Sequence, residues 1–405
     1  MQKKSVDSHR FSRVMHAVRL FSSVLCIATG LFSQSAGAAD KPAWKPGQTL
    51  PYGDGKVTIS QPHLVARSKG YLWFPSLSRL SDGRLLAIMT DYADEHVKIS
   101  TAQLTWSDDG GLTWTKPVQG RYGDPTLTLE NDDEILLPYY LKPIGENVMG
   151  EAFQLCKKGE KRAKLMDQKA TVSGWTRPDQ SFDPTTGVSG FVFNGDTLID
   201  NDKNYLAMLY GHYKDTPRYA LVLAESKDGI DWKLRSTIAG EDCPVPGGEG
   251  PCEAALCRLA DGRLMSIFRV ASGSPFGQSF SEDEGKTWSE ARAMPGVFSV
   301  QPSLEVMANG AVALSGGRPG LYLWLNRDGK GLEWNKFDVL DNHNEFVPAE
   351  KITDAGKTSA YTEVVALDEQ HLLYIYDRIP HSWSAIPADS KETNSIWVVR
   401  VTIEK

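Results

Sequence analysis

The sequence predicts an all-β protein, specifically a six-bladed β-propeller made of four-stranded antiparallel blades. One hairpin pattern occurs six times along the chain, and its copies lie about 57 residues apart. The 405 residues include 36 Gly and 22 Pro, with 11 Trp, 14 Tyr and 14 Phe, a composition typical of many short strands joined by turns. These observations favour a propeller over a helical bundle.

Residues 1–38 have the order of a secretory signal peptide. Basic residues come first, an apolar run follows over residues 20–32, and Ala36-Gly37-Ala38 forms a small-x-small cleavage site. The run contains Ser and Gly and is too short to span a bilayer comfortably, and no later segment approaches that length of apolar sequence. We therefore expect export to the periplasm or the extracellular space, no stable membrane insertion, and a folded domain over residues 39–405.

The exported chain is acidic. Removing residues 1–38 removes five basic residues and one acidic residue, which leaves 39 Lys and Arg against 50 Asp and Glu and a net charge near −11. Such a charge argues against general binding to nucleic acid or to an anionic membrane.

Four cysteines follow the leader: Cys156, Cys243, Cys252 and Cys257. An even number in an oxidising compartment allows disulfides. Cys243 and Cys252 bracket the Pro/Gly loop PVPGGEGP and form the pair we expect. No Cys-x-x-Cys or paired-His spacing indicates a metal site, and we expect neither a metal nor a cofactor.

The hairpin pattern consists of a β-prone run, a two-residue turn and a second apolar run, which is a strong hairpin signal when the turn is Asp-Gly or Asn-Gly. A period of 50–60 residues with four short strands per unit is that of a propeller. Residues 141–190 alternate poorly and carry KKGEKRAK, so we expect a solvated insertion between the second and third units. The six turns are Asp82-Gly83, Asn131-Asp132, Asp202-Lys203, Asp261-Gly262, Asn309-Gly310 and Asp368-Glu369.

A second pattern, S-x-D-x-G-x-T-W, occurs inside the units. It is complete at residues 107–114 and 281–288, and incomplete at SKDGIDW (226–232) and NRDGKGLEW (326–334). The Asp closes a tight turn by accepting backbone N–H groups, Gly allows a positive φ, and Trp packs between strands. This is an Asp-box, and we expect Asp109 and Asp283 to be structural.

Asp-boxes on six hairpin repeats resemble the sialidase superfamily of six-bladed propellers, over nearly the whole exported chain. The resemblance implies a Tyr nucleophile paired with a Glu, an Asp acid/base, and three Arg that hold the substrate carboxylate. A neutral Tyr avoids repulsion with an anionic sugar, and Arg binds carboxylates through two parallel hydrogen bonds.

Three segments carry the implied residues. CEAAL, followed by LADGRLMSIFR, is similar to the family strand with the Glu and nominates Glu253 as the partner base and Arg269 as a clamp residue. GGRPGLYLWLNRDG is similar to the strand with the last clamp Arg and nominates Arg318. SAYTEVVALDEQHLLYIYD is similar to the closing segment and nominates Tyr361 as the nucleophile.

The chain departs from the family at two places. Where the family has Arg-Ile-Pro, this chain has Trp73-Phe74-Pro75, so the first clamp Arg is replaced by Trp73. Two Arg would hold a carboxylate less tightly, and Trp73 could instead stack on the face of a uronic acid. The acid/base precedes the first Asp-box in the family; Asp91 and Asp94 are candidates here, and Asp94 has the better spacing.

The expected function is that of an exported, exo-acting glycoside hydrolase of the sialidase type. It would release a terminal acidic sugar (sialic acid) from glycoconjugates by a retaining Tyr/Glu mechanism. Two alternatives stay open: a glycosidase or lyase acting on uronic-acid polysaccharides, and a non-catalytic glycan-binding propeller. Catalysis is favoured if Tyr361 and Glu253 lie within hydrogen-bond reach and Arg269 and Arg318 meet at the same cavity.

Overall fold

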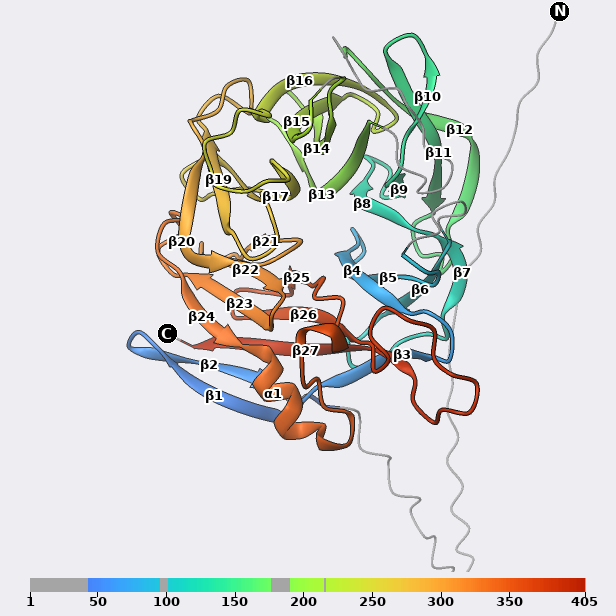
Figure 1. Ribbon diagram of the computed structural model, residues 1–405, viewed down its shortest axis with the longest axis vertical. Helices are drawn as coiled ribbons and strands as arrows, with labels where there is room; N and C mark the ends of the chain where they lie inside the picture. The colour runs from blue at the N-terminus through green and yellow to red at the C-terminus, as the bar shows by residue number, and fades with distance from the viewer. Residues whose placement is uncertain (1–42, 95–100, 176–189, 215, 405) are drawn as a thin grey trace, which may run out of the picture. The chain divides into compact units, whose positions relative to one another are not determined.

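A computed structural model of the chain describes residues 43–94, 101–175, 190–214 and 216–404. Within these ranges the protein is all-β, with a single α-helix and two 3₁₀ turns. The strands form antiparallel sheets arranged around a common centre (Figure 1), like the blades of a propeller. The first strands of successive sheets contact one another at that centre: β8 with β13, β13 with β17, β17 with β21, β21 with β25, and β25 with β4.

Three sheets are separate four-stranded meanders in chain order. The first is made of β4 (Trp73–Arg79), β5 (Leu85–Thr90), β6 (Thr101–Ser107) and β7 (Val118–Arg121). The second is made of β17 (Cys252–Arg258), β18 (Leu264–Arg269), β19 (Pro275–Ser281) and β20 (Arg292–Phe298). The third is made of β21 (Ser303–Val306), β22 (Val312–Gly317), β23 (Leu321–Asn326) and β24 (Asn335–Asp338).

Two further meanders are joined into one nine-stranded sheet, because β12 pairs in parallel with β16. One contains β8 (Gly123–Thr128), β9 (Glu134–Pro138), β10 (Lys142–Gly145), β11 (Val148–Cys156) and β12 (Lys164–Ser173). The other contains β13 (Phe191–Ile199), β14 (Tyr205–His212), β15 (Tyr219–Ser226) and β16 (Asp231–Ala239). The expected insertion over 141–190 is thus wrong for residues 142–173, which are mainly strand; residues 176–189 lie outside the described part.

The last sheet joins the two ends of the described chain. Its strands are β1 (Pro46–Tyr52), β2 (Gly55–Ser60), β3 (His63–Ser68), β25 (Glu363–Ala366), β26 (His371–Arg378) and β27 (Asn394–Glu404). Both β2 and β3 pair antiparallel with β27. The helix α1 (Val339–Phe346) begins at Asp338, whose carboxylate accepts the first free backbone N–H groups; the 3₁₀ turns η1 (Pro348–Glu350) and η2 (Ala355–Lys357) follow.

All six predicted hairpin turns join the first two strands of a meander. The second turn residue has a positive φ at Gly83, Gly262 and Gly310, and also at Asp132 and Lys203. Glycine adopts this conformation without a steric penalty, which explains why the Asp-Gly and Asn-Gly pairs were readable in the sequence.

The two complete S-x-D-x-G-x-T-W segments form the same turn. Asp109 accepts hydrogen bonds from the N–H of Thr113 (2.8 Å) and its hydroxyl (2.6 Å), and Asp283 accepts the equivalent pair from Thr287 at 2.8 and 2.7 Å. These bonds lower the pKa of Asp283 to about 2. Each carboxylate closes the turn between the third and fourth strands, so its role is structural.

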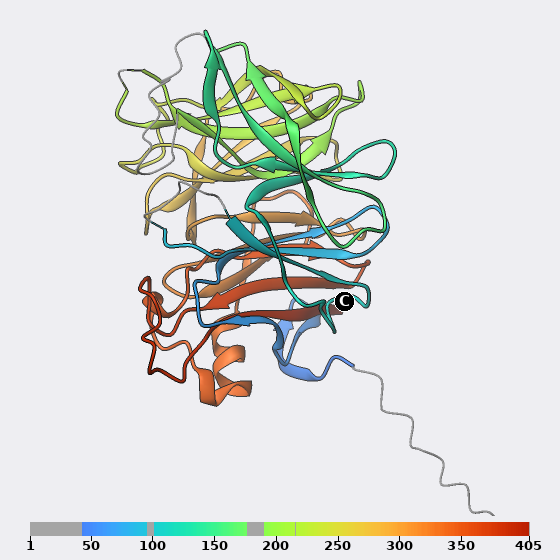
Figure 2. The ribbon, with the colours of Figure 1, turned by 90° about the vertical axis from the view of Figure 1, so that its right-hand side faces the viewer.

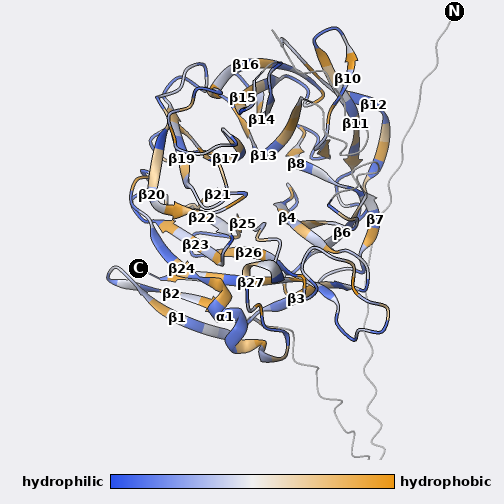
Figure 3. Ribbon diagram, in the orientation of Figure 1, coloured by the Kyte–Doolittle hydropathy of each residue, from blue (hydrophilic) through white to orange (hydrophobic). Residues whose placement is uncertain are grey.

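The core lies between neighbouring sheets, where their apolar faces meet. Figure 3 shows the hydrophobic colour on the strands and mostly hydrophilic colour on the turns. All four cysteines in the described ranges are buried and free, so the expected Cys243–Cys252 disulfide is wrong. No helix in the described ranges is long and apolar enough to cross a membrane.

Topology decides where functional side chains gather. The first strand of each meander runs toward its hairpin turn, and the second strand runs back. The start of the first strand therefore lies beside the end of the second, as where Cys252 of β17 pairs with Arg269 of β18. Residues at these positions therefore share the face of the ring opposite the six turns. Figure 2 shows the ring from the side, with α1 and the loop after β26 on one side of the sheets.

Candidate active site

Tyr361 and Glu253 meet at the centre of this face. Tyr361 precedes β25, Glu253 is the second residue of β17, and the Tyr361 hydroxyl donates a hydrogen bond to Oε1 of Glu253. The β17–β18 ladder shifts register between Cys252 and Ala254, a bulge that re-aims the side chain between them. Glu253 is only 5% exposed. The structure thus brings the two residues within hydrogen-bond reach.

Several polar groups orient the Glu253 carboxylate. Its Oε2 accepts the backbone N–H of Gln301 at 3.0 Å, and its Oε1 lies 2.8 Å from Nη1 of Arg269. Asn194 accepts the N–H of Ala254 at 2.6 Å and donates to the Gln301 side chain at 3.3 Å. Sequence reasoning missed Asn194 and Gln301, since neither belongs to a recognisable motif.

The Tyr361 phenol is neutral in this setting. Burial raises its pKa well above the ordinary value, and the negative charge of Glu253 raises it further, while Arg269 lowers it. Two more half-buried tyrosines lie nearby: the hydroxyls of Tyr139 and Tyr210 are 2.8 Å apart. A protonated Tyr361 can attack a carbon only if its proton leaves at the same time, and Glu253 is the acceptor in contact with it.

Arg269 lies in the site but is held by two carboxylates. Its Nη1 pairs with Glu253, and its Nη2 donates to both oxygens of Glu249 at 2.8 and 2.7 Å and to the Ser272 hydroxyl at 3.1 Å. Burial would lower the pKa of Arg269, but the charge of Glu253 and its hydrogen bond raise it, so the guanidinium is charged. Glu249 was not foreseen from the sequence.

Arg318 follows β22 and points toward the segment before Tyr361. Its Nη2 donates to the carbonyl of Ser359 at 3.2 Å, and its guanidinium lies 5.6 Å from the ring centre of Trp383. Arg318 has no ion pair with any described residue. Trp383 is 38% exposed and was not singled out in the sequence. Arg269 thus contacts Glu253 directly, and Arg318 contacts the segment before Tyr361; among the described residues, only Arg318 of the two has no carboxylate partner.

Trp73 is not a sugar-binding surface in this structure. Its side chain is 0% exposed, its Nε1 donates to the carbonyl of Tyr92 at 3.0 Å, and its ring packs against Phe74 (5.4 Å between ring centres) and Trp383 (5.6 Å). The expectation that Trp73 stacks on substrate is therefore wrong. The next residue, Phe74, lies beside the nucleophile candidate instead, 4.8 Å from Tyr361 between ring centres.

A buried carboxylate holds the segments on which these rings stand. Asp377 accepts the backbone N–H of Phe74 at 3.1 Å, the N–H of Ser359 at 2.7 Å and the hydroxyl of Thr358 at 2.7 Å. Burial raises its pKa despite these bonds. One side chain therefore fixes the backbone before Tyr361 relative to the start of β4.

Asp94 lies at the same end, in the turn after β5. Burial is the main cause of the raised pKa values of Tyr92 and Tyr140, and the negative charge of Asp94 raises both further. The ring centres of Tyr140 and Tyr139 are 4.8 Å apart. The other acid/base candidate, Asp91, accepts hydrogen bonds from two glutamine side chains at 2.7 and 3.0 Å. The charges of both acids raise the pKa of Tyr92, but only that of Asp94 also raises the pKa of Tyr140.

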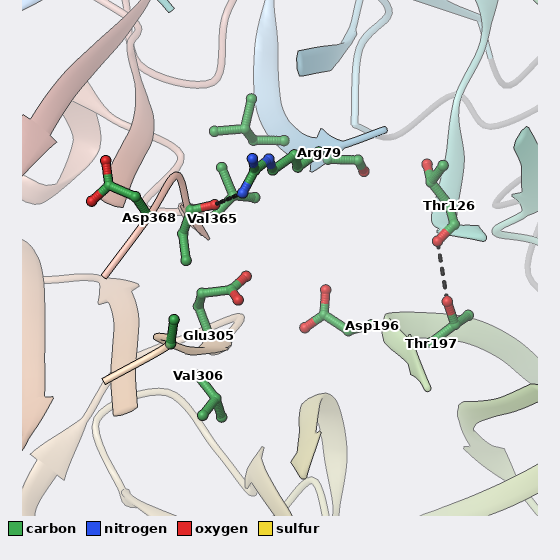
Figure 4. A pocket seen from close by; sticks show the side chains of 12 residues that line it. Arg79, Thr126, Asp196, Thr197, Glu305, Val306, Val365 and Asp368 are labelled. Atoms are coloured by element: carbon green, nitrogen blue, oxygen red, sulfur yellow. Dashed lines mark hydrogen bonds between the residues drawn. The ribbon is translucent and has the colours of Figure 1, made fainter. Parts of the chain in front are cut away.

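Below the site the centre of the ring is acidic. One cavity is lined by Tyr361, Asp124 and Asp196 among others, and a second, of about 460 Å³, opens at the hairpin-turn end. Figure 4 shows Asp196 and Glu305 pointing into the second cavity. Burial raises the pKa of Asp124 to about 8, of Asp196 to about 7 and of Glu305 to about 8. The described residues contain no group suited to holding a metal.

Comparison with solved structures shows a sialidase-like propeller fold. A protein of unknown function from Dyadobacter fermentans superposes with a TM-score of 0.62 at 16% identity, over 86% of this chain and 99% of its own. The NanB sialidase from Streptococcus pneumoniae gives 0.51 at 14% identity, over 85% and 70%. The α-L-arabinofuranosidase Arb93A from Fusarium graminearum gives 0.56 at 15% identity, over 84% and 97%.

No family profile and no curated protein matches the sequence. At such identities the likeness extends to the fold only.

Proposed function

We propose that the chain is an exported, retaining exo-glycosidase built on a six-bladed, sialidase-like propeller. The Tyr361–Glu253 pair carries this proposal, because it places a half-buried phenol in contact with a base that can take its proton. The leader at residues 1–38 supports export, and the six groups of four or more strands around the centre support the blade count.

In the first step the Tyr361 oxygen bonds to the anomeric carbon while its proton passes to Glu253. The bond from that carbon to the leaving oxygen breaks, and Asp94 supplies the proton that the leaving group needs. In the second step Asp94 takes a proton from water, the water oxygen bonds to the anomeric carbon, and Tyr361 leaves with the proton held by Glu253. Two inversions give net retention.

Nearby charges make this chemistry reasonable. Arg269 lowers the pKa of Tyr361 against the larger effect of burial, so it favours the negative charge that develops on the phenolic oxygen while the proton moves between Tyr361 and Glu253. Arg318, which has no acidic partner in the described part of the chain, can orient a polar group of the substrate. The buried Asp377 network keeps the nucleophile in place.

The sugar has two candidates. Release of terminal sialic acid follows from the sequence resemblance and from the presence of two Arg at the site. A neutral sugar is favoured by the engagement of Arg269 with two glutamates, and the neighbouring fold Arb93A is described as an arabinofuranosidase.

The test is turnover by the exported chain, residues 39–405, on 4-methylumbelliferyl α-sialoside, β-glucuronide and α-L-arabinofuranoside. Tyr361→Phe should lose activity on the order of 10³-fold or more, whereas Tyr322→Phe, a half-buried tyrosine on β23, should retain it. NMR of the first product anomer should show retention. Absence of turnover across a broad glycoside panel, or full activity in Tyr361→Phe, would overturn the proposal.

A further inference from the structure

We propose that Glu249 occupies the part of Arg269 that would bind a substrate carboxylate, and that the sugar held beside Tyr361 is therefore uncharged. This inference rests on the proposed glycosidase function and narrows its substrate to neutral glycosides. It makes Glu249 a specificity-determining residue.

The contacts of Arg269 leave no pair of parallel N–H groups free to bind a carboxylate. A carboxylate is bound bidentately by two parallel N–H groups of one guanidinium. Nη2 belongs to both such pairs, and its hydrogens are used by Glu249 (2.8 and 2.7 Å) and Ser272 (3.1 Å). Nη1 contacts Glu253 at 2.8 Å, and the buried Nε has no partner in the described structure. A substrate carboxylate would have to displace Glu249.

The backbone holds Glu249 in this position. Its N–H donates to the carbonyl of Val270 at 3.1 Å, and its carbonyl accepts the N–H of Tyr219 at 2.8 Å. Arg218 fastens the preceding loop by donating to the carbonyls of Glu241 (2.8 Å), Cys243 and Gly247 (both 3.3 Å). The Glu249 side chain is 40% exposed and so reaches Arg269 from the solvent side. It is a fixed partner on the side from which a ligand would approach.

The net charge of the site also argues for an uncharged sugar. The two positive charges of Arg269 and Arg318 are equalled by the negative charges of Glu249 and Glu253, both of which pair with Arg269. The position of a third clamp Arg is taken by the buried Trp73. A carboxylate that enters the site is attracted by no net positive charge, yet it loses its hydration. Only a well-placed ionic partner offsets that cost in free energy. A neutral sugar has no such cost.

Calorimetric titration with N-acetylneuraminic acid and with glucuronic acid tests this directly, without any need for turnover. Removing the carboxylate in Glu249→Ala should strengthen binding of these acids at least about tenfold over wild type, the range of one charge-assisted contact. Glu249→Gln keeps the size and should show a smaller gain. Glu290→Gln, an exposed glutamate on the β19–β20 connection, is the charge-matched control and should bind like wild type. Thermal melting confirms that each variant is folded.

Turnover separates the two proposals. Wild type should cleave the neutral α-L-arabinofuranoside or another neutral glycoside and should leave the sialoside and the glucuronide uncut. Efficient sialoside turnover by wild type, or equal binding of sialic acid by wild type and Glu249→Ala, overturns the role of Glu249 and leaves the glycosidase proposal standing. Absence of turnover on every glycoside overturns the glycosidase proposal, and calorimetry then still decides whether Glu249 excludes carboxylates.

Discussion

Phe74 and Tyr361 pack edge to face with their ring centres 4.8 Å apart, although they come from opposite ends of the described chain. Asp377 fixes the backbone on both sides of this contact. Phe74 directly follows Trp73, the residue that stands where the resemblance led us to expect a clamp Arg.

Phe74→Ala should reduce kcat more than it raises KM. Edge-to-face pairs contribute about 0.5–1.5 kcal/mol, and the loss frees the Tyr361 ring to leave its reactive position, so we expect a fall in kcat on the order of 10-fold. Phe74→Leu, which keeps apolar bulk, should lose less. Steady-state kinetics on the best substrate decide the matter; an unchanged kcat in Phe74→Ala would show that the contact does not position Tyr361.

Glu253→Gln removes the base and the negative charge beside Tyr361. We expect kcat/KM to fall by about 10²–10⁴, the usual contribution of a general base. The pKa of Tyr361 should also fall relative to wild type, because the charge of Glu253 adds to the effect of burial. Ultraviolet titration of the tyrosines measures this shift. Glu290→Gln is the control, and equal titration curves in wild type and Glu253→Gln would contradict the pairing.

Asp94→Asn should show its effect only when the leaving group needs a proton. For a sugar leaving group we expect a loss of about 10²–10⁴ in kcat/KM, and for a dinitrophenyl glycoside a much smaller one. Asp91→Asn is the matched control, since Asp91 is held by two glutamine side chains. If the loss were the same for both leaving groups, Asp94 would not be the acid.

Stability should decline as the pH rises from about 4 to about 8. Burial raises the pKa of Asp124 from 3.8 to about 8 and that of Asp196 from 3.8 to about 7. In this window the folded chain keeps protons that the unfolded chain has lost, so unfolding becomes easier with each unit of pH and levels off above it. Asp124→Asn, which mimics the protonated acid, should melt higher than wild type at pH 9 and about equally at pH 4. A melting temperature of wild type that does not change over this range would contradict the raised pKa values.

Local signals made much of the fold predictable. Asp-Gly and Asn-Gly turns and the S-x-D-x-G-x-T-W segments depend on neighbouring residues alone, and all of them form turns in the structure. Strands 142–173 were missed because their outer faces are polar and the apolar alternation is weak.

Only those site residues that belong to a sequence motif could be predicted. Tyr361, Glu253, Arg269 and Arg318 came from resemblance, and the structure places all four at one end of the ring. Glu249 and Trp383 lie in loops whose contacts depend on folding of distant segments, so no local pattern marks them. Cys243 and Cys252 bracket a loop as expected, yet they do not pair: Cys243 packs into an apolar cluster, and the Cys252 thiol contacts Glu249 and the carbonyl of Arg269.

The pairing of β3 with β27 joins residues 63–68 to residues 394–398. Every other meander is built from strands close together in the sequence, but this sheet needs both β3 (His63–Ser68) and β27 (Asn394–Glu404). The ring can therefore close only after β27 has been synthesised, and until then β2 and β3 present unpaired edges to other molecules. Loss of residues 394–404 would remove no residue of the site, yet it would leave the ring open beside Tyr361. Such a truncation would therefore abolish function through a folding defect.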